Sequence, residues 1–309
     1  MHLDYLHPHH YVPIMVLEYF NVSKFEDLPL LFTERLKEDI PYYSENGVLG
    51  FTYMHLPMVN WALRTLTQVL YAELIWNPDA DVHCILEEYF CNRYGAYAEE
   101  MKEVYRLSEE AWRFCTSWRA WKNKSLLSRL QGWDGEEPKA PLKLDDHFGT
   151  PESFEKMGSG SEAMLSEAMD ILENVIKTAK CQKTDIVQLF HGMPVNPVEL
   201  RKHQRNLGIE RNLGEDKRLL IYGLDTLRMM HRLGAYHNAL YERDAARTGR
   251  LWQEIEQLED KLESYYMPLT YDNPKVGLMS RDALTRTQLG DVIRRCRQYR
   301  LKAWGGKGL

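Results

Sequence analysis

Two short apolar runs, with a helical pattern between them, set the strongest limit on how this chain can fold. Residues 13–20 are apolar on both alternating faces until Glu18, and residues 48–54 form a second apolar run. Strands that are apolar on both faces are typical of parallel sheets, which helices cover on both sides. The sequence therefore predicts a parallel strand–helix–strand unit over residues 13–54.

The segment between these runs predicts the connecting helix. Ser23 and Glu26 have the spacing of a capping box, and we expect the helix to continue to about Tyr43. Asn46-Gly47 then ends the connection before the second strand. The apolar positions of this helix recur with a helical period: Leu28, Leu31, Phe32, Leu36 and Ile40.

From Pro57 onward the sequence predicts helices almost throughout. Apolar residues keep a period of about 3.6 from Val59 to Leu74. Asp81 is suited to cap the start of the next helix, and Gly95 is suited to end it. Further helices are expected over residues 97–118, 161–180, 185–191, 197–207, 216–243, 247–266 and 281–301.

Two segments lack a helical pattern. Residues 123–150 contain several glycines and prolines, which predicts a long surface excursion. Gly158 to Ser161 has neither the lysine nor the preceding strand of a phosphate loop, so we interpret it as a linker. The predicted fold class is mainly α, with a small N-terminal βαβ piece over residues 1–57 and a helical domain over residues 58–309.

Charge and composition exclude several classes of function. A net charge of −6 and a pI near 6.0 argue against bulk binding of nucleic acid. No apolar run reaches the roughly 20 residues of a membrane span, and the N-terminus lacks the pattern of a signal peptide. Five cysteines without a CxxC pair indicate reduced thiols. We therefore expect a cytoplasmic protein that binds no cofactor.

Three stretches of the chain carry a resemblance to a known family. These are residues 47–51, residues 70–82 and the segment from Tyr89-Phe90 to Tyr94-Gly95. Together they resemble an uncharacterised bacterial family whose members look like α-glucuronidases and other TIM-barrel glycoside hydrolases of the hexosaminidase type. The strand ending Glu18-Tyr19-Phe20-Asn21 also resembles the penultimate βα unit of those barrels.

The resemblance implies the C-terminal part of a carbohydrate-active protein whose barrel lies mostly upstream of Met1. Such a barrel needs eight strands, whereas this sequence predicts two. Glycoside hydrolysis would then require a barrel completed elsewhere. The alternative is a non-catalytic helical scaffold, or an interaction or dimerisation module, because unpaired strand edges and apolar faces invite a partner. The expected partners are a carbohydrate ligand, and a second copy or the missing barrel half.

Glu18 is the strongest candidate for a catalytic residue. Glycoside hydrolysis usually needs two carboxyl groups, and barrel active sites gather at the C-terminal ends of strands, where Glu18 lies. The alternative is a carboxylate that pairs with a nearby Arg or Lys or faces water. No second carboxylate is equally well placed, because Asp4 is close to the terminus and Glu45 precedes its strand.

Polar and aromatic residues near the two strands are candidates for sugar binding. Aromatic rings stack on sugar faces, and imidazole or amide groups bind hydroxyls; the alternative is that Trp61 and Tyr53 pack the strand–helix corner. A metal site at the N-terminal histidines is disfavoured, because adjacent residues of an extended segment point in opposite directions. The candidates are His9, His10, Tyr19, Asn21, Tyr53, His55, Asn60 and Trp61.

Overall fold

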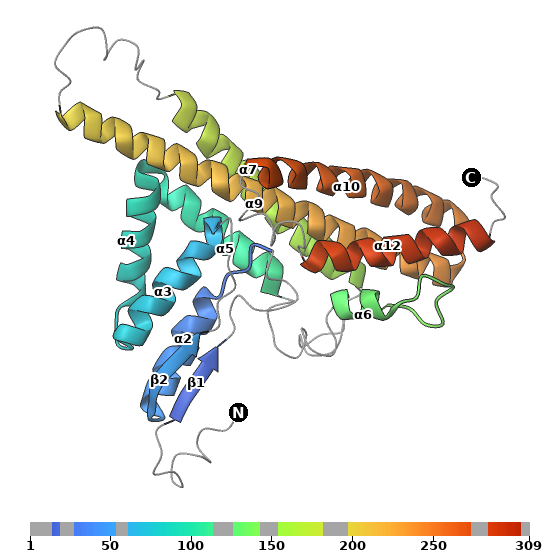
Figure 1. The fold of residues 1–309 in the computed structure, drawn as a ribbon, viewed down its shortest axis with the longest axis horizontal. Coiled ribbons are helices and arrows are strands. Elements are labelled where there is room, and N and C mark those ends of the chain that lie inside the picture. The colour runs from blue at the N-terminus through green and yellow to red at the C-terminus, as the bar shows by residue number, and fades with distance from the viewer. Residues whose placement is uncertain are drawn as a thin grey trace.

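The chain forms a mainly helical structure with one small parallel sheet (Figure 1). In the computed structural model, the described residues are 14–18, 28–53, 61–113, 126–142, 154–181, 197–272 and 284–303. The predicted fold class is confirmed at this level.

The sheet confirms the predicted strand–helix–strand unit. Strand β1 (Ile14–Glu18) pairs in parallel with β2 (Val48–Tyr53), and helix α2 (Thr33–Glu45) lies between them in the chain. Glu18 is in register with Tyr53 at one end of the sheet. The register shifts by one residue between Ile14 and Met15.

Helix α2 begins later than the capping-box pattern predicts. Residues 28–32 are not helical, and α2 begins at Thr33. Pro29 explains this difference, because a proline disfavours the helical conformation of the residue before it. Leu28 and Leu31 are nevertheless fully buried. The predicted cap at Ser23 lies outside the described residues.

The next helices follow the sequence signals closely. Asp81 caps α4, since its Oδ1 atom accepts hydrogen bonds from the backbone N–H groups of His83 (2.8 Å) and Cys84 (3.4 Å). Gly95 ends α4 with a φ of +60°, which favours glycine. The elements here are η2 (Ala62–Arg64), α3 (Thr65–Trp76), α4 (Val82–Tyr94), η3 (Gly95–Tyr97) and α5 (Ala98–Trp112).

The rest of the described structure consists of four long helices and the short α6, and α9 is the longest of them (Figure 1). The chain turns at Arg243, whose φ is +59°, and α10 runs back along α9. Helix α5 packs against α7, and α7 packs against α9. The elements are α6 (Leu126–Gly132), α7 (Phe154–Cys181), α9 (Pro197–Glu242), α10 (Ala245–Asp272) and α12 (Leu284–Ala303).

Helix α9 is continuous where the sequence predicts two helices. Gly208 and Gly214 lie inside it, although a helical glycine costs about 1 kcal/mol relative to alanine. Ile209 and Leu213 are buried in the core, and this packing outweighs the local preference.

The predicted linker and surface excursion are both wrong. Gly158 to Ser161 lies inside α7. The excursion contains α6 and carries Trp133 and Leu142 into the core. Asn238 holds this segment against α9, because its Oδ1 accepts a hydrogen bond from the Leu142 N–H group (2.7 Å).

Helices α2 and α3 share a small apolar core beside the sheet. Phe32 packs against both this cluster and the main core of the helical bundle. The predicted division at residue 57 therefore falls between two helices that pack on each other, and the two-domain division stays a prediction. The small cluster consists of Leu36, Ile40, Leu70, Tyr71 and Leu74.

Candidate functional site

Glu18 lies at the C-terminal end of β1, on the sheet face that α2 covers. The Tyr43 hydroxyl of α2 donates a hydrogen bond of 2.9 Å to Glu18 Oε1. The Tyr43 ring contacts Phe51 of β2 (centroids 5.7 Å apart), and Phe51 in turn contacts Tyr71 of α3. One partner of Glu18 is thus a phenol from the covering helix.

Burial and the nearby Glu18 carboxylate both raise the pKa of Tyr43 well above its usual range. Tyr43 therefore keeps its hydroxyl hydrogen and acts as a donor. This contact orients one oxygen of Glu18 toward α2.

Within the described residues, the opposite face of the sheet carries exposed apolar side chains of β1. Met15 and Leu17 are 59% and 46% exposed, and their register partners in β2 are Gly50 and Thr52. Met15 lies over Gly50, since a Cβ atom at Gly50 would be 2.8 Å from the Met15 Cε atom. Parallel sheets are normally covered on both faces, so this open face is the most unusual surface feature of the sheet.

Only part of the predicted sugar-binding set lies within the described residues. Tyr53 ends β2 opposite Glu18. Trp61 is half-buried just before η2, and its carbonyl accepts a hydrogen bond from the Arg64 N–H group (2.8 Å). A shared sugar site stays a prediction, because the other six candidates lie outside the described residues: His9, His10, Tyr19, Asn21, His55 and Asn60.

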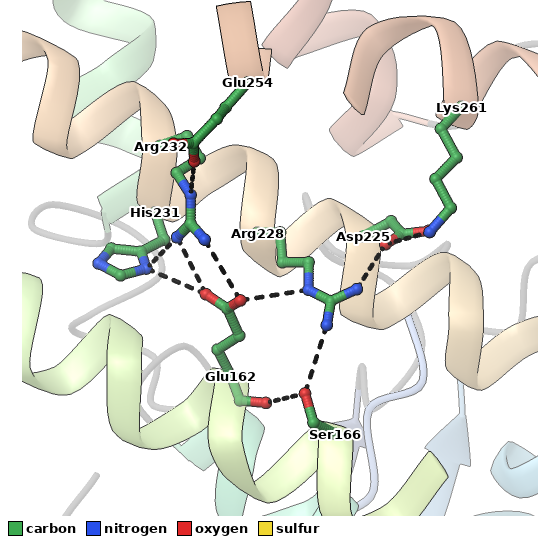
Figure 2. A network of polar contacts seen from close by, with 8 residues as sticks. All are labelled: Glu162, Ser166, Asp225, Arg228, His231, Arg232, Glu254 and Lys261. Carbon is green, nitrogen blue, oxygen red and sulfur yellow. Dashed lines mark hydrogen bonds and ion pairs between the residues drawn. The ribbon is translucent and has the colours of Figure 1, made fainter. Parts of the chain in front are cut away.

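A partly exposed network of charged side chains joins α7, α9 and α10 (Figure 2). Glu162 of α7 is its centre. One of its carboxylate oxygens accepts from Arg228 Nε (3.2 Å), and the other accepts from Arg232 Nη1 (3.0 Å) and contacts His231 Nδ1 (3.2 Å). Arg228 also bonds to Ser166 of α7 (3.4 Å).

The network reaches α10 through two further ion pairs. Asp225, which is fully buried, pairs with Arg228 (3.1 Å) and with Lys261 of α10 (2.7 Å). Arg232 pairs with Glu254 of α10 (2.6 Å). The carboxylates of Glu162, Asp225 and Glu254 thus face the three cations of Arg228, Arg232 and Lys261 (Figure 2). We interpret it as a clamp between helices.

The electrostatics of Glu162 agree with this interpretation. Hydrogen bonding from His231, together with Arg232 and Arg228, outweighs burial and lowers the pKa of Glu162 to about 2. The carboxylate is therefore ionised at neutral pH. Sequence reasoning missed this network, although the spacing of Asp225, Arg228 and Arg232 places them along one face of a helix.

Three further findings bear on function. Within the residues that the structure describes, no three His, Cys, Asp or Glu side chains gather as a set of metal ligands. None of the helices in those ranges combines the length and apolar character that crossing a bilayer requires. Comparison with protein-family models, with curated proteins and with solved structures found no match.

Proposed function

We propose that this chain is a helical scaffold that docks through its β1–α2–β2 unit onto parallel strands of a carbohydrate-active βα barrel. The observation that carries this proposal is the exposed pair Met15 and Leu17 on the sheet face opposite α2. The occupant of this face would be the strands of a barrel polypeptide.

The geometry of βα barrels supports this choice of partner. In such barrels the helices form the outer ring, and the other face of each strand points into a packed interior. Here α2 covers one face of the sheet, and Met15 and Leu17 lie on the other. Large apolar side chains of this kind fill the interior layers of a barrel. The resemblance of the surrounding residues to barrel glycoside hydrolases agrees with this proposal.

The outer edges of the two strands supply a second element of recognition. Within the described residues each strand pairs on one side only, so the backbone groups on its other side can hydrogen-bond to an added strand. An added parallel strand would extend the sheet in its own plane. The strands further round a closed barrel would then cover the face that carries Met15 and Leu17. The bundle beyond α3 would then act as the support that holds the unit in place.

A photo-crosslinking experiment tests this docking. Benzoylphenylalanine at position 17, on the face opposite α2, is expected to crosslink, in cells that make the protein, to a peptide that forms a strand of a parallel βα protein. The control is the same group at Leu301 of α12, which is also exposed. Equal yields at both positions, or a crosslink from position 17 to a second copy of the chain, would overturn the proposal.

A second candidate function is a direct catalytic contribution by Glu18. Its place at the strand end, oriented by Tyr43 at 2.9 Å, favours this role. In a barrel, however, Glu18 would point toward the helix layer, so it would reach a sugar only from the rim. The test is turnover of aryl-glycosides and glucuronylated oligosaccharides by the complex captured above, with and without Glu18→Gln. Equal rates would remove Glu18 from the chemistry and leave the docking proposal intact.

A further inference from the structure

A buried chain of hydroxyl groups ends at a carboxylate where α4, α5 and α9 meet. Asp216 of α9 is fully buried, and its Oδ2 accepts a hydrogen bond from the Tyr94 hydroxyl of α4 (2.5 Å). The Tyr105 hydroxyl of α5 lies 2.5 Å from that of Tyr94, and the Tyr89 hydroxyl lies 3.3 Å from that of Tyr105. Arg93 Nη2 lies 3.4 Å from the other oxygen, Oδ1.

When Asp216 is ionised, the number of donors and acceptors fixes the direction of each hydrogen bond between these hydroxyl groups. A tyrosine hydroxyl has one hydrogen and two lone pairs. Tyr94 gives its hydrogen to Asp216 and accepts one from Arg93 Nε (2.8 Å). Tyr94 must therefore accept a second hydrogen bond, which the Tyr105 hydroxyl donates. Tyr105 has then used its own hydrogen, so Tyr89 must donate to Tyr105.

A proton on Asp216 forces the opposite direction. Oδ1 faces a donor, Arg93 Nη2, so the added proton is placed on Oδ2, which then donates to Tyr94. Tyr94 now accepts from Asp216 and Arg93, and its hydrogen must turn to Tyr105. Tyr105 must in turn donate to Tyr89. Tyr89 is the most exposed of the three tyrosines, at 9%, so solvent can accept its released hydrogen.

We infer that this cluster is a pH-responsive joint. Uptake of one proton by Asp216 reverses three tyrosine hydroxyls, and this reverses the direction of the hydrogen bonds that link α4 to α9 and to α5. The contacts that anchor the end of α4 do not depend on that proton. Asn212 Nδ2 donates to the Arg93 carbonyl (3.1 Å), and Arg205 Nη2 donates to the Cys91 carbonyl (3.3 Å). The joint therefore changes its internal bonding while the helices stay docked.

The pKa of Asp216 lies close enough to neutral pH for such a joint to respond to small changes in pH. Burial raises the pKa of Asp216 to about 6, although Arg93 and Tyr94 oppose the shift; Glu215 on the same helix adds to it. Burial also raises the pKa values of the three tyrosines above their usual range. Among the groups facing Asp216, the tyrosines keep their hydrogens and Arg93 keeps its charge near neutral pH.

Carbon-13 NMR of the full chain tests the joint directly. The Asp216 carboxyl carbon should titrate with a midpoint near pH 6, and the ring carbons of Tyr89, Tyr94 and Tyr105 should shift with the same midpoint. The tyrosines themselves do not ionise there, so a shared midpoint reports hydroxyl reversal. An Asp216 signal without that midpoint, or tyrosine signals that do not follow it, would overturn the inference.

A variant supplies an independent readout. In Tyr105→Phe, the Tyr89 hydrogen turns to solvent in both states. The protonated state leaves the Tyr94 hydrogen with no acceptor, whereas the ionised state keeps the Tyr94–Asp216 bond. A buried donor without a partner is costly, so proton affinity at Asp216 should fall about tenfold, a midpoint lower by about one pH unit. Tyr236→Phe, a buried tyrosine elsewhere on α9, is the control and should leave the midpoint unchanged. A midpoint that rises in Tyr105→Phe would contradict the inference.

Discussion

Pro29 packs so closely against Gly223 of α9 that a Cβ atom at position 223 would lie 2.5 Å from the Pro29 Cγ atom. This contact joins the segment that leads into α2 to the central helix. It also explains why position 223 is a glycine, although a glycine inside a helix is less stable than an alanine.

Replacing Gly223 should therefore destabilise the protein. Gly223→Ala is expected to lower the free energy of unfolding by about 1–3 kcal/mol, because the backbone segment at Pro29 has to move. Gly214→Ala on the same helix meets no atom within 4 Å and should raise it by about 0.5–1 kcal/mol. Urea unfolding of both variants measures the difference. A stabilising Gly223→Ala would show that the close approach is not maintained in solution.

Asp216 should make stability depend on pH in a direction opposite to most carboxylates. Its pKa is raised from 3.8 to about 6 on folding, so its contribution is present below about pH 3.8 and is lost as pH rises through 6. Relative to Asp216→Asn, the wild type should lose up to about 3 kcal/mol across this range, at 1.4 kcal/mol for each pKa unit. Measurement of the free energy of unfolding of both proteins from pH 4 to pH 7 gives the difference between them. A difference that stays constant over this range would show that the pKa of Asp216 is not raised in the folded protein.

Glu162 should show the opposite pH dependence. Its pKa is lowered from 4.5 to about 2, so the ionised form stabilises the fold above about pH 4.5 and this contribution is lost as pH falls toward 2. Glu162→Gln should lower the free energy of unfolding at pH 7 by about 2 kcal/mol, because two arginines lose their shared acceptor. Glu38→Gln removes an exposed ion pair and should change it by less than about 0.5 kcal/mol. Equal effects at pH 7 would argue against a helix clamp.

Asn238 should control how firmly residues 133–142 are held on α9. Asn238→Ala leaves the buried Leu142 N–H group without its acceptor, which is expected to cost about 1–3 kcal/mol. Faster hydrogen exchange at Trp133 and Leu142 should accompany the loss. Asn174→Ala, on the exposed side of α7, is the control. Unchanged exchange in Asn238→Ala would mean that apolar burial alone holds this segment.

Signals that act over a few residues were enough to predict much of the fold. The two-sided apolar strands predict the parallel pair, and Asp81 and Gly95 mark the two ends of α4. Each of these features depends on neighbours within about one helical turn or on the strand itself. The strand-end position of Glu18 is a prediction of the same kind, and the register confirms that position.

The errors fall where distant contacts outweigh local preference. Gly158 to Ser161 has the composition of a linker, yet α7 includes it and buries Ser161. Residues 123–150 contain turn-forming residues, yet Trp133 and Leu142 pack into the core. Local propensities are worth about 1 kcal/mol or less per residue, and burying one large apolar side chain is worth about 1.5–3 kcal/mol.

The sequence by itself determined that this chain is mainly helical, that its N-terminal part forms a parallel βαβ unit, and where α4 begins and ends. These properties follow from the spacing of apolar residues, from helix capping and from backbone preferences, which all act between residues close together in the chain. Only the tertiary structure decided that Glu18 faces Tyr43, that Met15 and Leu17 are left exposed, and that Glu162 and Asp216 become centres of polar clusters between helices. Those relations join residues far apart in the chain, and packing, not local sequence, selects which of them meet.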